Sequence, residues 1–352
     1  MRPVDLARPE IRALAPYASA RALADSAGIL LNANENPWPP PHDGGLALNR
    51  YPDPQPEALR ARLAERYEVG EDRLLITRGS DEGIDLLNRA FCRAGVDQVL
   101  TCPPCFGMYG LSARIQGAGV VEVALREGAD GWQLDDPALE AAPECRLYFL
   151  CSPNNPTGHL IDPGWIGAFA ERVAGHGLVV VDEAYIELTD QPSATGLIDA
   201  HANVVVLRTL SKAYALAGCR LGALVADPSI VGLLKRIIAP YPLPTPAIDA
   251  ALRALAEPER TREQVARLAV EKDRLVETLQ AHPGVTAVWP GAANFVLIRA
   301  SDGPGLVAAA AAAGIRLRDQ SAQPGLADCV RITIGTRVET DALIQFLEDW
   351  RP

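Results

Sequence analysis

The chain has 352 residues, and its 33 lysines and arginines against 44 aspartates and glutamates give a formal net charge of −11. Nucleic acid and anionic membranes bind through basic surfaces, and this sequence has no run of lysine and arginine to supply one. It also lacks a membrane-spanning apolar stretch of roughly 18 residues and the apolar core of a signal peptide. We therefore expect a cytoplasmic protein whose partners are small molecules, with no nucleic acid and no membrane.

The predicted elements begin with an N-terminal arm, residues 1–31, that carries a short helix. The proline- and glycine-rich stretch 37–45 should be an irregular linker. Beyond it, helical patterns alternate with short apolar strands, which we predict at 74–77, 98–101, 120–124, 147–151, 178–182, 204–208 and 221–226. Helices are predicted at 57–67, from an N-cap at Ser80 or Asp81 to about Arg93, and at 165–175.

The last third of the chain has a different pattern. A long helical region, 246–282, is interrupted near Pro258, and strands are predicted at 294–299, 315–318 and 330–334. An alanine-rich helix ends at Gly314, and a closing helix starts at Glu339. Continuously apolar strands separated by helices are typical of a parallel sheet covered on both faces. We therefore predict an α/β fold with a mostly parallel central sheet, followed by a smaller α+β domain.

Polar side chains follow three of the predicted strands, where an α/β sheet collects its ligands. Strand 147–151 runs into a proline-rich turn that contains Asn155, and strand 178–182 ends in Asp182, with Tyr185 three residues later. Taken singly, the loop with Asn155 is better explained as an Asx turn, and a capping aspartate explains Asp182 as well as a functional role does. A carboxylate at the end of a wholly apolar strand, however, is costly to bury unless it faces a cation or a strong donor.

The three lysines differ in their surroundings. Lys235 and Lys272 fall in amphipathic helical patterns and are expected on solvated helix faces. Lys212 alone lies at a strand end among hydroxyl groups, where an amine that forms a Schiff base would be placed. Cys102 and Cys105 form the one Cys-x-x-C pair, but no second cysteine or histidine pair follows at zinc spacing, so we expect no metal site.

One cofactor satisfies all of these groups. Pyridoxal 5′-phosphate has an aldehyde for Lys212, a protonated ring nitrogen for Asp182, a phenolate oxygen for Asn155 and Tyr185, and a phosphate. The candidate phosphate ligands lie at a helix start and around the lysine; they are Ser80, Asp81, Thr209, Ser211 and Arg220. The order S-P-N-N-P-T-G (152–158), D-E-A-Y (182–185) and S-K-x-x-x-L-A-G-x-R (211–220) closely resembles the fold-type I aminotransferases.

The resemblance extends over nearly the whole chain. Segments similar to the histidinol-phosphate aminotransferase family are 14–17, 31–37, 50–53, 103–109, 238–243, 317–320 and 330–336. The resemblance implies a cytoplasmic homodimer that interconverts histidinol phosphate plus 2-oxoglutarate and imidazole acetol phosphate plus glutamate in histidine biosynthesis. It also implies a large cofactor domain, 46–245, and a small domain built from 246–352 together with the arm, 1–45.

The same resemblance implies roles for the cofactor residues. Lys212 would form the Schiff base with pyridoxal phosphate and then act as acid and base. Asp182 would keep the ring nitrogen protonated, while Asn155 and Tyr185 would hydrogen-bond the ring oxygen. Phe106 would stack on the ring where many relatives carry tyrosine, so any role of that hydroxyl is missing here.

Five further residues would complete the site. Tyr51 would reach the cofactor phosphate of the neighbouring subunit, although a tyrosine that anchors a turn is the alternative. Arg331 would bind the distal anion of the substrate, because guanidinium pairs bidentately with carboxylate or phosphate. Arg318 and Tyr17 would add phosphate contacts, with an exposed strand-end arginine as the alternative for Arg318. Asn34 would lie near the substrate with no assigned role.

Three other readings remain open at this stage. An aromatic amino acid aminotransferase would share the cofactor residues but would not need Arg318 and Tyr17. A pyridoxal-phosphate-dependent decarboxylase of a phosphorylated amino acid would share them as well, and release of carbon dioxide would reveal it. The ligand-binding domain of a transcription regulator would need a basic helix-turn-helix extension, for which only about 50 residues precede Tyr51.

Overall fold

The large domain of the chain is organised around a seven-stranded sheet. The computed structural model describes residues 2–17, 28–128 and 131–351. The strands lie in the order β1 (Leu74–Thr77), β9 (Gly222–Val225), β8 (Val204–Thr209), β7 (Leu178–Asp182), β6 (Leu147–Cys151), β2 (Gln98–Thr101) and β3 (Gly119–Glu122). Strand β9 runs antiparallel to both neighbours, and the other pairs are parallel. The mostly parallel α/β architecture is therefore confirmed.

Both faces of this sheet are covered, because successive side chains of a strand point to opposite faces. Val179 and Val181 belong to one apolar core, and Leu178 and Val180 to the other. The first core includes residues of α2 (Glu57–Tyr67), α6 (Pro163–Val173) and α8 (Thr245–Leu255). The second includes residues of α3 (Gly79–Phe91), α4 (Met108–Gln116) and α7 (Pro228–Leu234). This double cover explains the wholly apolar strand sequences.

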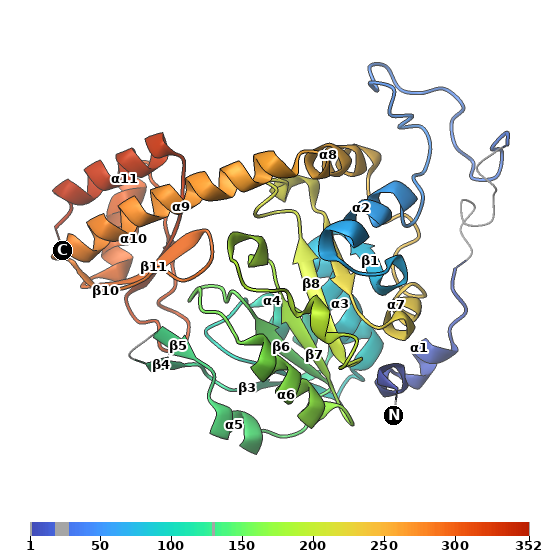
Figure 1. The fold of residues 1–352 in the computed structure, drawn as a ribbon, viewed down its shortest axis with the longest axis horizontal. Coiled ribbons are helices and arrows are strands. Elements are labelled where there is room, and N and C mark those ends of the chain that lie inside the picture. The colour runs from blue at the N-terminus through green and yellow to red at the C-terminus, as the bar shows by residue number, and fades with distance from the viewer. Residues whose placement is uncertain (1, 18–27, 129–130, 352) are drawn as a thin grey trace.

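The last third of the chain folds around a second, smaller sheet. The long helix α9 (Pro258–Ala281) leads from α8 to a four-stranded antiparallel sheet (Figure 1). Its order is β10 (Val285–Trp289), β11 (Phe295–Ala300), β13 (Cys329–Thr333) and β12 (Arg318–Asp319). Residues of α9, α10 (Gly303–Ala312) and α11 (Arg337–Asp349) share an apolar core with this sheet.

Several element boundaries differ from the predictions. Strand β10 and a short hairpin, β4 (Arg126–Gly128) with β5 (Gly131–Gln133), were not predicted; nearly all of their residues are exposed or half-buried, unlike those of the central strands. Strand β12 covers two residues rather than the predicted 315–318. Helix α3 begins at Gly79, so Ser80 and Asp81 lie in its first turn and not at its N-cap. The short helix α5 (Asp136–Ala141) lies outside the predicted set.

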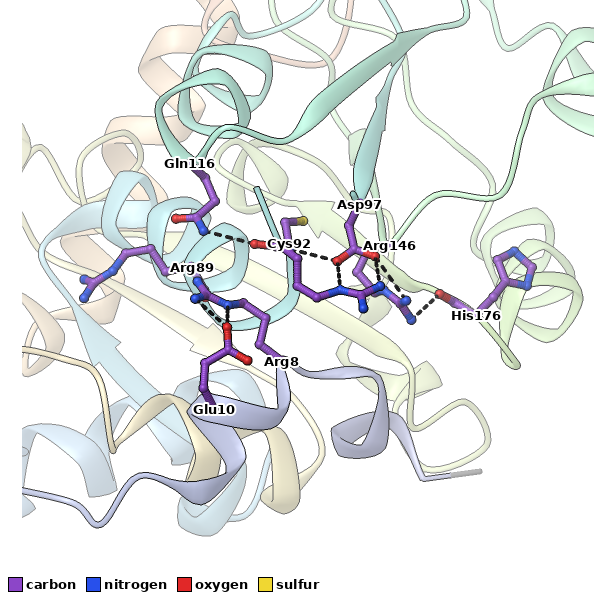
Figure 2. Close-up of polar contacts among 9 residues, drawn as sticks. Arg8, Glu10, Arg89, Cys92, Asp97, Gln116, Arg146 and His176 are labelled. Carbon is purple, nitrogen blue, oxygen red and sulfur yellow. Dashed lines mark hydrogen bonds and ion pairs between the residues drawn. The ribbon is translucent and has the colours of Figure 1, made fainter. Parts of the chain in front are cut away.

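The N-terminal helices pack on the large domain. Leu6, at the end of the 3₁₀ helix η1 (Pro3–Leu6), is buried in the second core. Arg8, which precedes α1 (Pro9–Ala13), donates from its backbone N–H to the Ala90 carbonyl and from Nη1 to the Arg89 carbonyl, each at 2.9 Å. Its guanidinium also holds Glu10 (Figure 2). The assignment of the whole arm to the small domain stays a prediction.

An ion-pair network beside this contact ties strand β2 to its neighbours. Asp97 accepts hydrogen bonds from Arg93 at 2.8 Å and from Arg146 at 3.3 Å, and Arg146 also donates to the His176 carbonyl (Figure 2). Burial favours the protonated form of Asp97, but the two arginines outweigh it and lower the pKa of this carboxyl to about 2. The network therefore links the segments that enter β2, β6 and β7 at the amino ends of these strands.

Within the described ranges, no helix combines the length and the apolar character needed to cross a membrane.

Candidate active site

Side chains from six separate segments meet in one pocket at the carboxyl ends of β6, β7 and β8. Its volume is about 140 Å³. Among its lining residues are all but one of the predicted cofactor ligands: Ser80, Asp81, Phe106, Asn155, Asp182, Tyr185, Thr209, Ser211, Lys212 and Arg220. Parallel strands bring their carboxyl ends to one edge of the sheet, which is why residues so distant in sequence converge. A larger groove of about 750 Å³, beside α2 and α9, contains none of them.

Asp182 occupies the floor of the pocket. It is 3% exposed, Tyr109 donates its hydroxyl hydrogen to Oδ2 at 2.7 Å, and the Ala184 N–H donates to Oδ1 at 3.2 Å. Burial raises the pKa of Asp182 to about 6, against the opposing effect of these two hydrogen bonds. Such a carboxylate is stabilised by any cation placed beside it, and a protonated ring nitrogen is one.

Tyr109 is a site residue to which the sequence reasoning gave no role. It is fully buried, stacks on Phe149 at a centroid distance of 4.9 Å, and meets Phe106 edge-on at 5.7 Å. It therefore contacts both the predicted ring-stacking residue and the predicted partner of the ring nitrogen. A usable signal was present, because Tyr109 follows Phe106 by only three residues where the chain turns into α4, with the Tyr109 N–H donating to the Phe106 carbonyl at 3.5 Å.

The opposite end of the pocket suits an anion. Helix α3 begins there, and the N–H groups of its first turn have no partner within the helix. Arg220 donates from Nη2 to Asp81 Oδ2 at 2.8 Å, so the Asp81 carboxylate is taken up by that arginine. Asp81 could thus contribute its backbone N–H to a phosphate, while its side chain orients Arg220. A Cβ on Gly222 would lie 2.8 Å from the Ser80 nitrogen, so this approach requires glycine.

Lys212 lines the same pocket as Asp182 and the start of α3. Its Nζ lies 5.4 Å from the centre of the Tyr185 ring. Partial burial lowers the pKa of Lys212, and the positive charge of Arg331 lowers it further. A lysine with a lowered pKa is more often neutral, which is the form that attacks an aldehyde. The position and the charge environment therefore fit the predicted Schiff base.

Arg331, on strand β13 of the four-stranded sheet, does not line the pocket itself but contacts one of its lining residues. Its Nη1 donates to Asn155 Oδ1 at 2.5 Å, although 176 residues separate the two in sequence. Its Nε is buried and has no hydrogen-bond partner among the described residues. Arg318 lies directly opposite Arg331 in the β12–β13 pair. Burial lowers the pKa of Arg331, and the charge of Arg318 contributes to this. Two neighbouring guanidinium groups with an unused donor are suited to an anion, and the role of Arg318 and Arg331 in substrate binding stays a prediction.

Besides Arg318 and Arg331, three predicted residues are absent from the lining of the pocket. Tyr17 is 73% exposed, and Asn34 is exposed with a positive φ of 56°. Tyr51 stacks on Tyr241 with ring centroids 4.4 Å apart. All three belong to the segment between α1 and α2, whose described part loops away from the rest of the chain (Figure 1). Their roles in cofactor or substrate binding stay predictions.

Pyridoxal phosphate fits the residues that are present. The pocket offers an amine, a buried carboxylate that gains from a cation, and a helix N-terminus with an arginine for a phosphate. Phe106 lies on its wall as an aromatic surface for the ring. Each part of the cofactor therefore has a complementary group in a pocket that no other part of the described chain duplicates.

Comparison with known proteins agrees with this chemistry. The model of the family "Aminotransferase class I and II" matches residues 29–347. Proteins named histidinol-phosphate aminotransferase from Xanthomonas euvesicatoria pv. vesicatoria (strain 85-10) and Xylella fastidiosa (strain 9a5c) are each 46% identical, over 98% of this chain and 96% of their own.

A solved structure of histidinol-phosphate aminotransferase from Sinorhizobium meliloti, in complex with pyridoxal 5′-phosphate, superposes with a TM-score of 0.77 at 25% identity. It covers 90% of this chain and 89% of the other. The family model spans most of the sequence, and the relatives match it nearly from end to end. The chain thus belongs to the class I and II aminotransferases, within the histidinol-phosphate aminotransferase family, and its cofactor is pyridoxal phosphate.

Proposed function

We propose that this aminotransferase interconverts histidinol phosphate plus 2-oxoglutarate and imidazole acetol phosphate plus L-glutamate, a step of L-histidine biosynthesis. The observation that carries the proposal is the pair of arginines on adjacent strands, Arg318 opposite Arg331, of which Arg331 lies close enough to Lys212 to lower its pKa. A substrate that bears a phosphate in one half-reaction and a distal carboxylate in the other needs a cationic site that accepts both. The names of the relatives at 46% identity support the same substrates.

The proposed chemistry divides the work among the pocket residues. Bound pyridoxal phosphate supplies an electron sink that stabilises a carbanion next to the reacting nitrogen. The amine of Lys212 removes a proton from one carbon and returns it to another. Asp182 holds the ring nitrogen in its protonated form, and Tyr109 orients Asp182 from behind. Tyr185 and Asn155 orient the ring through its oxygen.

The substrate end of the pocket is assigned to the two arginines. Arg331, whose Nη1 donates to Asn155, would bind the distal anion through its Nε, which has no partner among the described residues. Arg318 is exposed and would add a second charge when that anion is a phosphate. Tyr17 and Asn34 would join them from the N-terminal arm. A phosphate carries more negative charge than a carboxylate, so the second arginine favours the phosphorylated substrate.

We also propose that the enzyme works as a cytoplasmic homodimer. Within the described part of the arm, Ile29, Leu31 and Trp38 are 91%, 87% and 76% exposed, which is unusual for large apolar side chains. A second copy of the chain would cover them. Tyr51 would then reach the cofactor phosphate of the partner subunit, and the arm, 1–45, would complete a small domain with 246–352 beside the cofactor domain, 46–245.

The substrate assignment is tested by single-turnover reactions that follow the visible absorption of the cofactor. Histidinol phosphate and glutamate should each abolish this absorption rapidly, and phenylalanine should do so slowly. Carbon dioxide should not be released, since its release would identify a decarboxylase. Rapid reaction with phenylalanine and none with histidinol phosphate would instead identify an aromatic aminotransferase and refute the proposal.

The role of Arg318 has its own test. Arg318→Ala should raise the KM of histidinol phosphate much more than that of glutamate, because only the phosphate uses the second charge. Arg316→Ala is the matched control, since Arg316 is exposed two residues earlier and donates to the Ala311 carbonyl. Equal weakening of both amino donors by Arg318→Ala would show that its assignment to the phosphate is wrong.

A further inference from the structure

One of the two lysines that were expected on solvated helix surfaces is not there. Lys272, on α9, is half-buried, and its Nζ donates to the carbonyls of Gly291 at 2.6 Å and Ala293 at 2.9 Å. Burial lowers the pKa of its ammonium group. Lys235, at the end of α7, is exposed as expected. The expectation was wrong for Lys272 because helical periodicity cannot show that a loop from another element covers that face.

The loop that Lys272 holds, residues 290–294, connects β10 to β11 and touches the cofactor domain. The Ala292 N–H donates to the Gly158 carbonyl at 2.7 Å. The backbones approach so closely that a Cβ on Gly158 would lie 2.7 Å from the Gly291 Cα, and one on Gly291 would lie 2.5 Å from the Gly158 Cα. Loop 290–294 is therefore a direct contact between the small-domain sheet and the S-P-N-N-P-T-G loop, 152–158.

Both sides of this contact lead to the active site within a few residues. Loop 152–158 contains Asn155, the hydrogen-bond partner of Arg331. Loop 290–294 continues into Phe295, which is 3% exposed and meets the Tyr185 ring edge-on at 5.4 Å. The Arg331 guanidinium lies over the same Phe295 ring, 5.4 Å from its centre. A shift of the loop would therefore move Arg331 relative to Asn155.

Packing alone does not fasten the loop to α9. A cavity of about 290 Å³ lies between them, lined by Val265, Leu268 and Ala269 of the helix and by the loop itself. Lys272 also lines this cavity, and its two hydrogen bonds join the helix to the loop there. Their donor is charged, which makes them stronger than neutral hydrogen bonds. The lysine is thus the polar link from the long helix to the loop.

We propose that Lys272 is a positioning residue, which holds loop 290–294 against loop 152–158 so that Arg331 meets the substrate anion from a fixed place. The inference rests on the proposed role of Arg331 in binding that anion. Lys272 touches neither cofactor nor substrate. Its loss should therefore weaken substrate binding while cofactor binding stays intact, a split that a general loss of stability would not produce.

The test uses the complete enzyme with its cofactor, glutamate as the only amino donor and isotopically labelled 2-oxoglutarate as the amino acceptor, so that each turnover releases unlabelled 2-oxoglutarate and forms labelled glutamate. Lys272→Met removes the ammonium but keeps most of the apolar stem. It should raise the KM for glutamate roughly tenfold, as expected for loss of about one hydrogen bond, with kcat within about twofold. Cofactor affinity and the visible spectrum should not change. Lys272→Arg should recover most of the KM, because guanidinium can donate to both carbonyls.

Lys235→Met is the matched control, with the same change of charge and side chain at an exposed position, and it should leave the KM unchanged. An unaltered KM in Lys272→Met, an equal rise in Lys235→Met, or a parallel loss of cofactor affinity would each overturn the proposal. Should Lys272→Met fail to fold, Lys272→Gln, which keeps one donor group, is judged by the same criteria.

The choice of glutamate separates this proposal from the substrate assignment. Histidinol phosphate is absent from the assay, so an error in that assignment would leave the Lys272 result unaffected. Arg331→Ala is measured alongside. If it did not raise the glutamate KM, the role of Arg331, and with it the inference for Lys272, would be refuted.

Discussion

The buried carboxylate of Asp182 should make the cofactor-free enzyme less stable as the pH rises. In the folded chain burial raises the pKa of this group from an ordinary 3.8 to about 6. Each pKa unit corresponds to about 1.4 kcal/mol, so the ionised carboxylate costs the folded state about 3 kcal/mol. Since the folded-state pKa is raised, the cost is absent below the unfolded pKa, grows between about pH 4 and pH 6, and is complete above the folded pKa.

Asp182→Asn removes the charge and keeps the shape of the side chain. Its one oxygen can accept from the Ala184 N–H in place of Oδ1, and its Nδ2, in place of Oδ2, can donate to the Tyr109 hydroxyl oxygen. The variant without cofactor should therefore be more stable than wild type at pH 7.5, by up to about 3 kcal/mol, and nearly equal to it at pH 4. Urea unfolding followed by tryptophan fluorescence at several pH values measures the difference. Asp349→Asn, an exposed carboxylate at the end of α11, is the control and should follow wild type throughout.

Cofactor binding gives a second readout of the same reasoning. A protonated ring nitrogen beside Asp182 offsets the burial of the negative charge, so wild type loaded with pyridoxal phosphate should lose less stability between pH 4 and 7.5. In Asp182→Asn the cofactor should not alter the pH dependence in this way. If wild type and Asp182→Asn without cofactor showed parallel stability curves across this range, the carboxylate would not be ionised at a cost, and the argument would be refuted.

Three further predictions concern single contacts. Tyr109→Phe removes a donor from the buried carboxylate of Asp182 and should lower the free energy of unfolding by about 2 kcal/mol at pH 7.5, but by less at pH 4, in urea titrations. Gly158→Ala should lower the melting temperature and raise the glutamate KM, because φ is +72° and the Cβ has no room; Gly175→Ala, in open space, should do neither. Asp97→Asn should cost about 2 kcal/mol at neutral pH, since the arginines hold its pKa near 2, and the difference from wild type should vanish as the pH falls through that value.

Much of the secondary structure was predictable because short segments of the sequence determine it. An uninterrupted apolar strand such as 178–182 requires cover on both faces, and the helix predicted at 57–67 coincides with α2. Strand-end residues could be located for the same reason: a chain that leaves a parallel sheet at its carboxyl edge delivers the next side chains to the common binding edge. Lys212 and Asp182 could therefore be named as pocket residues from the sequence and its resemblance to a family.

The contacts between elements could not be derived in this way. Tyr109 meets Asp182 across 73 residues, and Arg331 meets Asn155 across 176. Lys272, whose helical pattern indicated only a solvated face, holds a loop about twenty residues away. The sequence by itself determined which segments become strands and helices and which polar groups they deliver to the binding edge. Only the tertiary structure decided how those groups are paired, because pairing depends on how whole elements pack, and local patterns carry no record of that packing.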